Sequence, residues 1–288
     1  MDFGNVLTAM VTPFDLEGNI DLERTSILID HLLKSGTEGL VIAGTTGESA
    51  TLSQDEKIKL FKHVVNIVNK RVPVLAGTGT NNTAASIDLT KEAEACGVDG
   101  IMLVCPYYNK PSQRGLYEHF TAIAQATSLP IMLYNIPGRS VVNLSGETII
   151  QLSSIENIVS VKEASGDLDQ VSDIIENTDD HFSVYAGDDG MTLPMLALGA
   201  DGVVSVASHI IGNEMNQMVH SFRRGDVNAA ASSHRKLLPV MKGLFTAPSP
   251  TPVKAALEMK GIQVGGVRLP LVPLTNQEKS GLKALIND

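Results

Sequence analysis

The chain has 288 residues, of which 43% are hydrophobic and 19% charged, an ordinary composition for a globular protein. Its 32 acidic and 22 basic residues give a net charge of −10, which argues against nucleic acid as a partner. No stretch of 18 apolar residues occurs, so no membrane span is expected. The start, MDFGNVLTAM, lacks the basic and apolar regions of a signal peptide, and Cys96 and Cys105 do not indicate a disulfide framework. A soluble, cytoplasmic protein is the expectation.

Short apolar runs alternate with longer segments of helical periodicity. The runs occupy residues 6–12, 39–44, 72–78, 100–105, 130–135, 158–162, 182–187 and 202–207. They are mostly hydrophobic throughout, which is typical of parallel strands covered on both faces. Between them, Asp21 and Ser53 are placed as helix N-caps, and Gly36, Gly97 and Gly199 are placed just after helix ends. Eight such units predict an α/β fold, a closed (β/α)8 TIM barrel.

The pattern changes after about residue 224. Three further helical segments follow, interrupted by APSPTP and by VGGVRLPLVP. We expect residues 1–224 to form the barrel that carries the active site. Residues 225–288 are expected to form a C-terminal helical extension rather than an independent domain.

Lys162 comes directly after the apolar residues of the sixth run. Such a lysine can reach water from the strand end, or burial can keep it partly neutral so that its amine attacks a carbonyl. Active sites of (β/α)8 barrels form at the carboxyl ends of the strands, which places Lys162 on the catalytic rim. The other polar stretches at such ends are GTTGES at 44–49, CPYYN at 105–109, YNIPGR at 134–139 and GDDG at 187–190.

Each of these stretches allows a structural and a functional interpretation. The GTTGES turn offers backbone N–H groups and two hydroxyls that could hold a carboxylate or phosphate, or it could simply connect strand to helix. The Tyr134 hydroxyl could exchange protons near Lys162 or be satisfied in the core. Arg139 could clamp a carboxylate or lie on the surface. Asp188 and Asp189 favour helix capping over metal binding, and no metal site is expected.

Together these motifs resemble the dihydrodipicolinate synthase family of pyruvate-dependent, Schiff-base class I aldolases. The resemblance rests on GTTGES, PYYNKPSQRGLYEHF, YNIPGR followed by VSVKEASG, and GDD, and it runs from TAMVTPF to VRLPLVPLT. Its most specific part is YNIP followed by a lysine 28 residues after Tyr134. The resemblance implies condensation of pyruvate with L-aspartate 4-semialdehyde to 4-hydroxy-tetrahydrodipicolinate, in lysine and diaminopimelate biosynthesis. It implies no cofactor, because the lysine itself supplies the electron sink.

The resemblance also assigns catalytic residues. Lys162 would form the imine with pyruvate, and Tyr134, Thr45 and Tyr108 would relay protons. Tyr108 would reach in from a neighbouring subunit, so at least a homodimer is expected, and a homotetramer is equally compatible.

The substrate-binding residues follow in the same way. Thr45 and Thr46 would hold the carboxylate of pyruvate, and Arg139 would bind the carboxylate of L-aspartate 4-semialdehyde. Gly187 and Val204 would line the pocket.

Two alternatives remain open. An N-acetylneuraminate lyase or a keto-deoxy sugar acid aldolase would share Lys162 and Tyr134, but a sugar-chain pocket does not call for the cation of Arg139. A barrel that binds a keto acid without turnover is disfavoured by the intact set of candidate residues.

Family members inhibited by L-lysine bind it at a subunit interface near the second-strand loop. By resemblance, four positions match that site and three depart. The matches are Ser49, Ala50, Asn81 and Tyr107, and the departures are Gln54, Lys57 and Ala85. Since a glutamate is missing and a cation is added, near insensitivity to L-lysine is expected.

Overall fold

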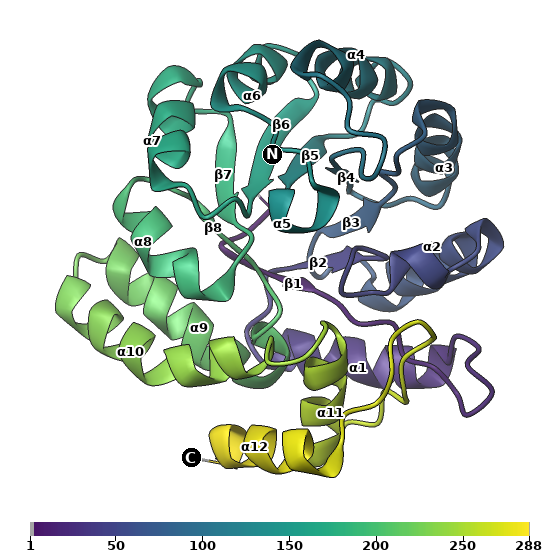
Figure 1. Ribbon diagram of the computed structural model, residues 1–288, viewed down its shortest axis with the longest axis vertical. Coiled ribbons are helices and arrows are strands. Elements are labelled where there is room, and N and C mark those ends of the chain that lie inside the picture. Colours follow the sequence, from purple (N-terminus) through teal and green to yellow (C-terminus); the bar gives the residue numbers. More distant parts are fainter. Residues whose placement is uncertain (1–2, 288) are drawn as a thin grey trace.

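The computed structural model describes residues 3–287 and has a closed barrel of parallel strands at its centre (Figure 1). The strands follow chain order around the ring, and β1 closes it by pairing with both β2 and β8. They are β1 Val6–Ala9, β2 Gly39–Ile42, β3 Val74–Gly77, β4 Gly100–Val104, β5 Ile131–Asn135, β6 Ile158–Glu163, β7 Ser183–Ala186 and β8 Gly202–Ser205. Each strand lies within or close to a predicted apolar run, so the predicted (β/α)8 barrel is confirmed.

Helices surround the barrel and connect consecutive strands. The larger ones are α1 Leu22–Lys34, α2 Gln54–Val68, α3 Thr83–Ala95, α4 Gln113–Ala124, α6 Gly146–Ser153, α7 Leu168–Asn177, α8 Thr192–Ala197 and α9 Ser208–Arg223. Short helices follow three strand ends: η1 Ser49–Thr51, α5 Pro137–Ser140 and η2 Asp189–Met191.

The predicted helix boundaries agree with the backbone geometry. Asp21 accepts a hydrogen bond from the first turn of α1, and Ser53 forms a reciprocal capping box with α2. Gly36, Gly97 and Gly199 all have positive φ, the conformation that ends a helix at low cost for glycine.

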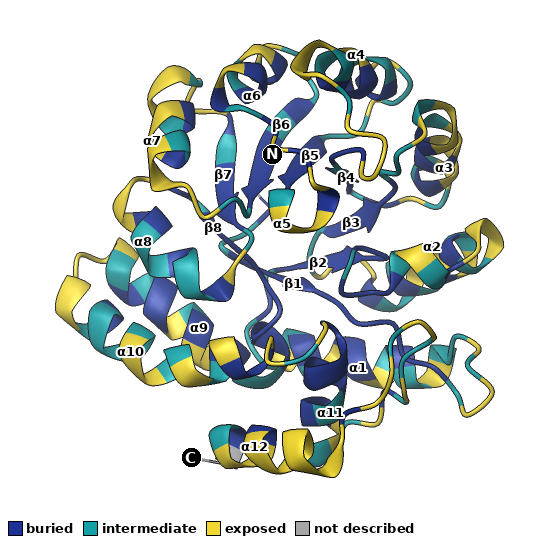
Figure 2. Ribbon diagram, in the orientation of Figure 1, coloured by how far each residue is buried: buried dark blue, intermediate teal, exposed yellow. Residues whose placement is uncertain are grey.

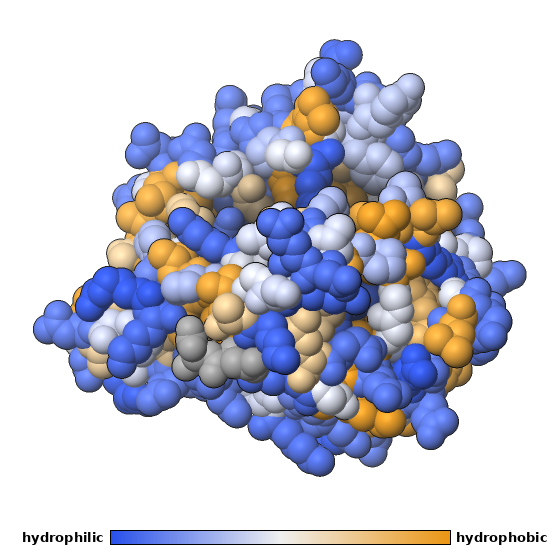
Figure 3. Space-filling model, turned by 60° about the horizontal axis from the view of Figure 1, so that its bottom comes forward, coloured by the Kyte–Doolittle hydropathy of each residue, from blue (hydrophilic) through white to orange (hydrophobic). Residues whose placement is uncertain are grey.

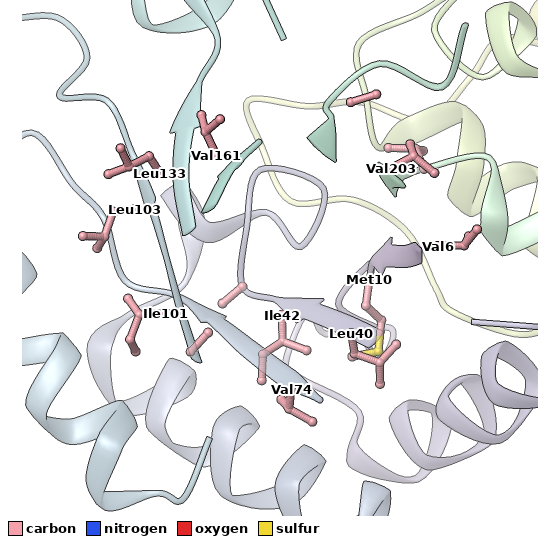
Figure 4. Packing of buried hydrophobic residues seen from close by; sticks show 14 of the residues in the cluster. Val6, Met10, Leu40, Ile42, Val74, Ile101, Leu103, Leu133, Val161 and Val203 are labelled. Atoms are coloured by element: carbon pink, nitrogen blue, oxygen red, sulfur yellow. The ribbon is translucent and has the colours of Figure 1, made fainter. Parts of the chain in front are cut away.

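Two hydrophobic cores lie on the two faces of the barrel wall, because successive side chains of a strand point to opposite faces. On β5, Leu133 joins the outer core between strands and helices, whereas Met132 and Tyr134 join the inner core. Figure 4 shows part of the outer core, and Figure 2 shows the buried strands inside partly exposed helices. Lys162 follows the outward-facing Val161, so its side chain points into the barrel.

Three helices follow the barrel: α10 Val227–Gly243, α11 Thr251–Met259 and α12 Asn276–Asn287. They confirm the three predicted helical segments. Both α10 and α11 pack against α9, and α12 packs on both of them, away from the barrel wall (Figure 1). We propose that residues 225–288 are an extension of the barrel unit, because α10 and α11 pack against α9 and α12 packs on α10 and α11.

The surface in Figure 3 is mostly hydrophilic, with separate hydrophobic patches. Within residues 3–287, no helix combines the length and the apolar character needed to cross a membrane. Both cysteines carry free thiols: Cys105 is buried, and Cys96 is partly buried.

Candidate active site

Lys162 lies at the carboxyl-terminal mouth of the barrel, one residue before the end of β6, and is only 4% exposed. Its Nζ is 4.1 Å from the centre of the Tyr134 ring. Burial lowers the pKa of Lys162 to about 8, with Asp189 opposing the shift and Arg139 adding to it. Among residues 3–287, no carboxylate lies within ion-pair distance of Lys162. A substantial fraction of this amine is therefore neutral near pH 8.

Tyr134 stands beside Lys162 because the two residues are directly paired across β5 and β6. Burial raises the pKa of Tyr134 to about 12, against the opposing effects of Arg139 and a hydrogen bond with Thr45. The phenol is therefore protonated at neutral pH. It can donate its proton and take another in the same step, as a relay group must.

The turn after β2 places hydroxyls and N–H groups at the same mouth. A Cβ at Gly44 would lie 3.1 Å from the Met102 Cε, so the methionine side chain would have to shift to admit it. Thr45 is partly exposed, and Thr46 is buried at 5% exposure. A residue after β1 helps to fix this turn: the Thr12 hydroxyl donates to the Gly47 carbonyl at 2.7 Å.

A cavity of about 370 Å³ opens beside these residues. Thr45, Tyr134 and Arg139 line it, together with Pro270 and Leu271 from the C-terminal extension. Arg139 lies on the short helix α5 and is exposed, so its guanidinium is available to an anion in the cavity.

Gly187 and Val204 lie deeper in the barrel mouth. A Cβ at Gly187 would approach the Ala164 Cβ to 2.7 Å and the Lys162 Cε to 3.2 Å, so a glycine makes room for the lysine side chain. Val204 belongs to the inner core that also contains Tyr134. Neither residue lines the cavity of about 370 Å³ directly.

Tyr108 does not join this group within one chain. It is 87% exposed in the loop after β4, with φ of +74°. This combination is unusual for a tyrosine. The left-handed backbone conformation costs free energy for a residue with a side chain, and the exposed ring gains no free energy from burial.

Glu163 and Asn135 were not recognised from the sequence as part of the site. They are paired across β5 and β6, one residue beyond Tyr134 and Lys162, and point to the outer face. The Asn135 amide donates to both Glu163 oxygens at 3.2 and 3.0 Å, and Gln170 donates to Glu163 at 3.0 Å. This buried network fixes the strand register that brings the lysine and the tyrosine together. The sequence signal for this network is that β5 and β6 each end in two consecutive polar residues.

The expectation that both aspartates cap the following helix is correct only for Asp188, which accepts from the N–H of Gly190. Asp189 instead accepts from the Ser205 hydroxyl and from the N–H groups of Val206 and Ala207. Asp189 is buried, and these hydrogen bonds connect the segment after β7 to the segment that leads into α9. Within residues 3–287, no cluster of three or more potential metal ligands occurs.

A closed (β/α)8 barrel with a buried lysine beside a buried tyrosine at its carboxyl-terminal mouth has the layout of a Schiff-base-forming barrel enzyme.

Residues 2–288 match the Dihydrodipicolinate synthetase family, and the chain belongs to this family. A 4-hydroxy-tetrahydrodipicolinate synthase of Halalkalibacterium halodurans is 67% identical over 286 residues, covering 99% of this chain and 98% of that protein. The enzyme of that name from Bacillus subtilis is 60% identical over 289 residues, covering all of both chains. The crystal structure of a dihydrodipicolinate synthase from Bacillus anthracis superimposes with a TM-score of 0.98 at 57% identity, covering 100% of this chain and 98% of that one.

Proposed function

We propose that this enzyme condenses pyruvate with L-aspartate 4-semialdehyde to give 4-hydroxy-tetrahydrodipicolinate, as a step of lysine and diaminopimelate biosynthesis in the cytoplasm. The observation that carries the proposal is the buried Lys162 amine, 4.1 Å from the Tyr134 ring, in a chain whose relatives carry the synthase name. The family membership favours this reaction over that of an N-acetylneuraminate lyase or a keto-deoxy sugar acid aldolase.

Lys162 starts the reaction as a neutral amine. It attacks the ketone carbon of pyruvate, and loss of water leaves a protonated imine. Loss of a proton from the methyl group then gives an enamine, whose carbon attacks the aldehyde carbon of the second substrate. The amino group of that substrate finally attacks the imine carbon, closes the ring and returns Lys162 as a free amine.

Proton transfer in these steps is assigned to Tyr134, Thr45 and Tyr108. The first member of this relay is the protonated phenol of Tyr134. The second is the Thr45 side chain, which is hydrogen-bonded to it. We propose that Tyr108 is the third member and that it acts in the site of a neighbouring subunit. Its 87% exposure in the single chain supports this role. The enzyme would then be active as a homodimer or homotetramer.

The substrate carboxylates have separate candidate binding groups. The turn with Thr45 and Thr46 would hold the pyruvate carboxylate and so position the ketone against Lys162. Arg139, at the cavity wall, would bind the carboxylate of L-aspartate 4-semialdehyde. Gly187 and Val204 would shape the floor beneath the imine.

The test is chemical trapping. The protein is incubated with pyruvate and borohydride, digested, and searched by mass spectrometry for a lysine that carries the reduced adduct. Modification at Lys162, followed by turnover of pyruvate with L-aspartate 4-semialdehyde, supports the proposal. An unmodified Lys162, or pyruvate-dependent cleavage of a sialic acid in place of this condensation, contradicts it.

A further inference from the structure

The turn that carries Thr45 and Thr46 ends in Glu48, a buried residue whose backbone lies in the left-handed region with φ of +57°. A non-glycine residue holds this conformation only where its surroundings fix it. The N–H of Glu48 donates back to the Thr45 carbonyl at 3.1 Å, and its own carbonyl accepts from Thr51 at 3.0 Å. The backbone of Glu48 is therefore hydrogen-bonded to Thr45 on one side and to Thr51 on the other.

The Glu48 carboxylate is held by the C-terminal extension. One oxygen lies 2.7 Å from Nζ of Lys254 on α11, and the other accepts from the backbone N–H of Arg268 at 2.9 Å. The Glu48 and Lys254 side chains are 1% and 2% exposed. A charge removed from water to this extent requires its partner, so neither side chain can leave the contact independently.

Lys254 is itself fixed from two other directions. Its Nζ donates to the Gly266 carbonyl at 2.7 Å and lies 4.1 Å from the centre of the Phe14 ring. The backbone of Phe14 donates in turn to the Val264 carbonyl at 3.0 Å. Figure 1 shows the corresponding loop between α11 and α12 beside the segment that leads from β1 to α1.

Arg268 contacts the residues that follow this turn in the chain. Its guanidinium donates to the Thr51 carbonyl at 2.8 Å and pairs with Glu56 in the first turn of α2. The chain after β2 is thus attached to the extension at Glu48, at the end of the turn, and again at Thr51.

We propose that Lys254 is a positioning residue for catalysis: through its buried ion pair with Glu48, it sets where the threonine turn holds the carboxylate of pyruvate. This inference rests on the proposed function of that turn. It gives the C-terminal extension a part in substrate binding, because it supplies the cation that anchors a pyruvate-binding element of the barrel.

The experiment compares full-length variants by steady-state kinetics with both substrates. Lys254→Met keeps an unbranched apolar side chain, one atom shorter than lysine, and removes the charge. We expect it to raise the KM for pyruvate by roughly 10- to 100-fold, since a displaced binding group can cost about that much, and to raise the aldehyde KM much less. Glu48→Gln keeps an acceptor for Arg268 and should give a smaller rise of the same kind.

Two further variants separate positioning from general stability. Lys254→Arg keeps the cation, and the adjoining cavity of about 610 Å³ has room for the larger group, so the pyruvate KM should recover. The matched control is Lys260→Met, because Lys260 ties the end of α11 to the Ile286 carbonyl at 2.9 Å without touching the turn. It should lower the melting temperature and leave the pyruvate KM unchanged.

The double variant Glu48→Gln, Lys254→Met removes both charges. Its pyruvate KM should rise by less than the product of the two single effects, because the singles disrupt one interaction. If Lys254→Met does not fold, Glu48→Gln and the double variant decide.

An unchanged pyruvate KM in folded Glu48→Gln and Lys254→Met, with normal trapping of Lys162 in the wild type, would overturn this inference alone. Absence of pyruvate trapping in the wild type would overturn the proposed function and this inference with it.

Discussion

Two buried lysines in this molecule are alike in burial and aromatic contact and differ in their polar neighbours. Lys162 and Lys254 are 4% and 2% exposed, and each lies 4.1 Å from the centre of an aromatic ring. Burial lowers the pKa of both to about 8. Lys254 has a carboxylate at 2.7 Å and a carbonyl acceptor at 2.7 Å, whereas Lys162 lacks a carboxylate at ion-pair distance within the described residues.

The difference teaches that burial alone does not make a lysine a nucleophile. The Lys254 amine is held in place by the ion pair with Glu48 and the hydrogen bond to Gly266, and attack on a carbonyl would leave Glu48 as an unpaired buried charge. The Lys162 amine has no carboxylate at ion-pair distance among the described residues, so it is not held in this way.

The most direct way to break the comparison is to remove Lys162, the lysine proposed to react. Lys162→Ala should abolish both condensation and borohydride trapping while the fold remains, and Lys162→Arg should fail as well because guanidinium cannot supply a neutral amine. Trapping and circular dichroism of each variant are the measurements. Retained pyruvate trapping in Lys162→Ala, for instance on Lys254, would show that the wrong lysine has been assigned.

The space around the Lys162 amine is the next point to test. Gly187→Ala should strongly reduce kcat and cost about 1–3 kcal/mol of stability, since its Cβ would lie 2.7 Å from Ala164 and 3.2 Å from Lys162. The rate of trapping and the melting temperature are to be measured together. Gly281→Ala on α12 is the control, because nothing lies within 4 Å of the added carbon. Equal kcat in the two variants would contradict a role of Gly187 beside the lysine.

Arg139 should affect one substrate more than the other. Loss of a charge-assisted hydrogen bond in Arg139→Ala costs about 1.5–3 kcal/mol, which raises the KM for the aldehyde roughly 10- to over 100-fold. The KM for pyruvate should change far less. Steady-state kinetics with each substrate varied in turn measures both values, and equal effects on the two would rule out the assigned role.

The pH dependence of imine formation reports the state of Lys162. With a pKa of about 8, about a tenth of the amine is neutral at pH 7, against about three in ten thousand at the ordinary value of 10.5. Raising the pH removes the proton, so the initial trapping rate should increase about tenfold per pH unit well below 8 and level off above it. A rate that keeps rising to pH 10 would mean that burial does not shift this lysine.

The smallest expected effect concerns Lys57, a third buried lysine. It is 8% exposed and lines the same cavity as Ser49 and Tyr107, and burial lowers its pKa. A second cation should bind poorly beside it, and Ala85 offers no carboxylate. L-Lysine, titrated at pyruvate near its KM, should leave activity nearly unchanged. Half-inhibition at submillimolar L-lysine would refute this expectation.

Much of the fold was predictable because its signals are local. Apolar runs, the capping box at Ser53 and the glycines after helices each depend on a few consecutive residues. The pairing of Tyr134 with Lys162 follows from two strand ends in neighbouring units.

The contacts that the sequence did not reveal join distant segments. Glu48 was seen only as part of a turn, since nothing in GTTGES indicates that its carboxylate reaches Lys254 and Arg268. Asp189 resembled a local cap because its partners after β8 become neighbours only in the closed barrel. Such pairings are set by tertiary packing, which short patterns do not encode.

The attachment of the threonine turn has a consequence for synthesis on the ribosome. Glu48 and Arg268 are 220 residues apart, so at ordinary translation speeds roughly 10–40 s pass between the emergence of the two. During this interval the nascent chain holds a Glu48 carboxylate whose partners do not yet exist, and the turn must remain open to water. The second strand is among the first to be made, but its loop acquires its final shape only as the last helices leave the exit tunnel.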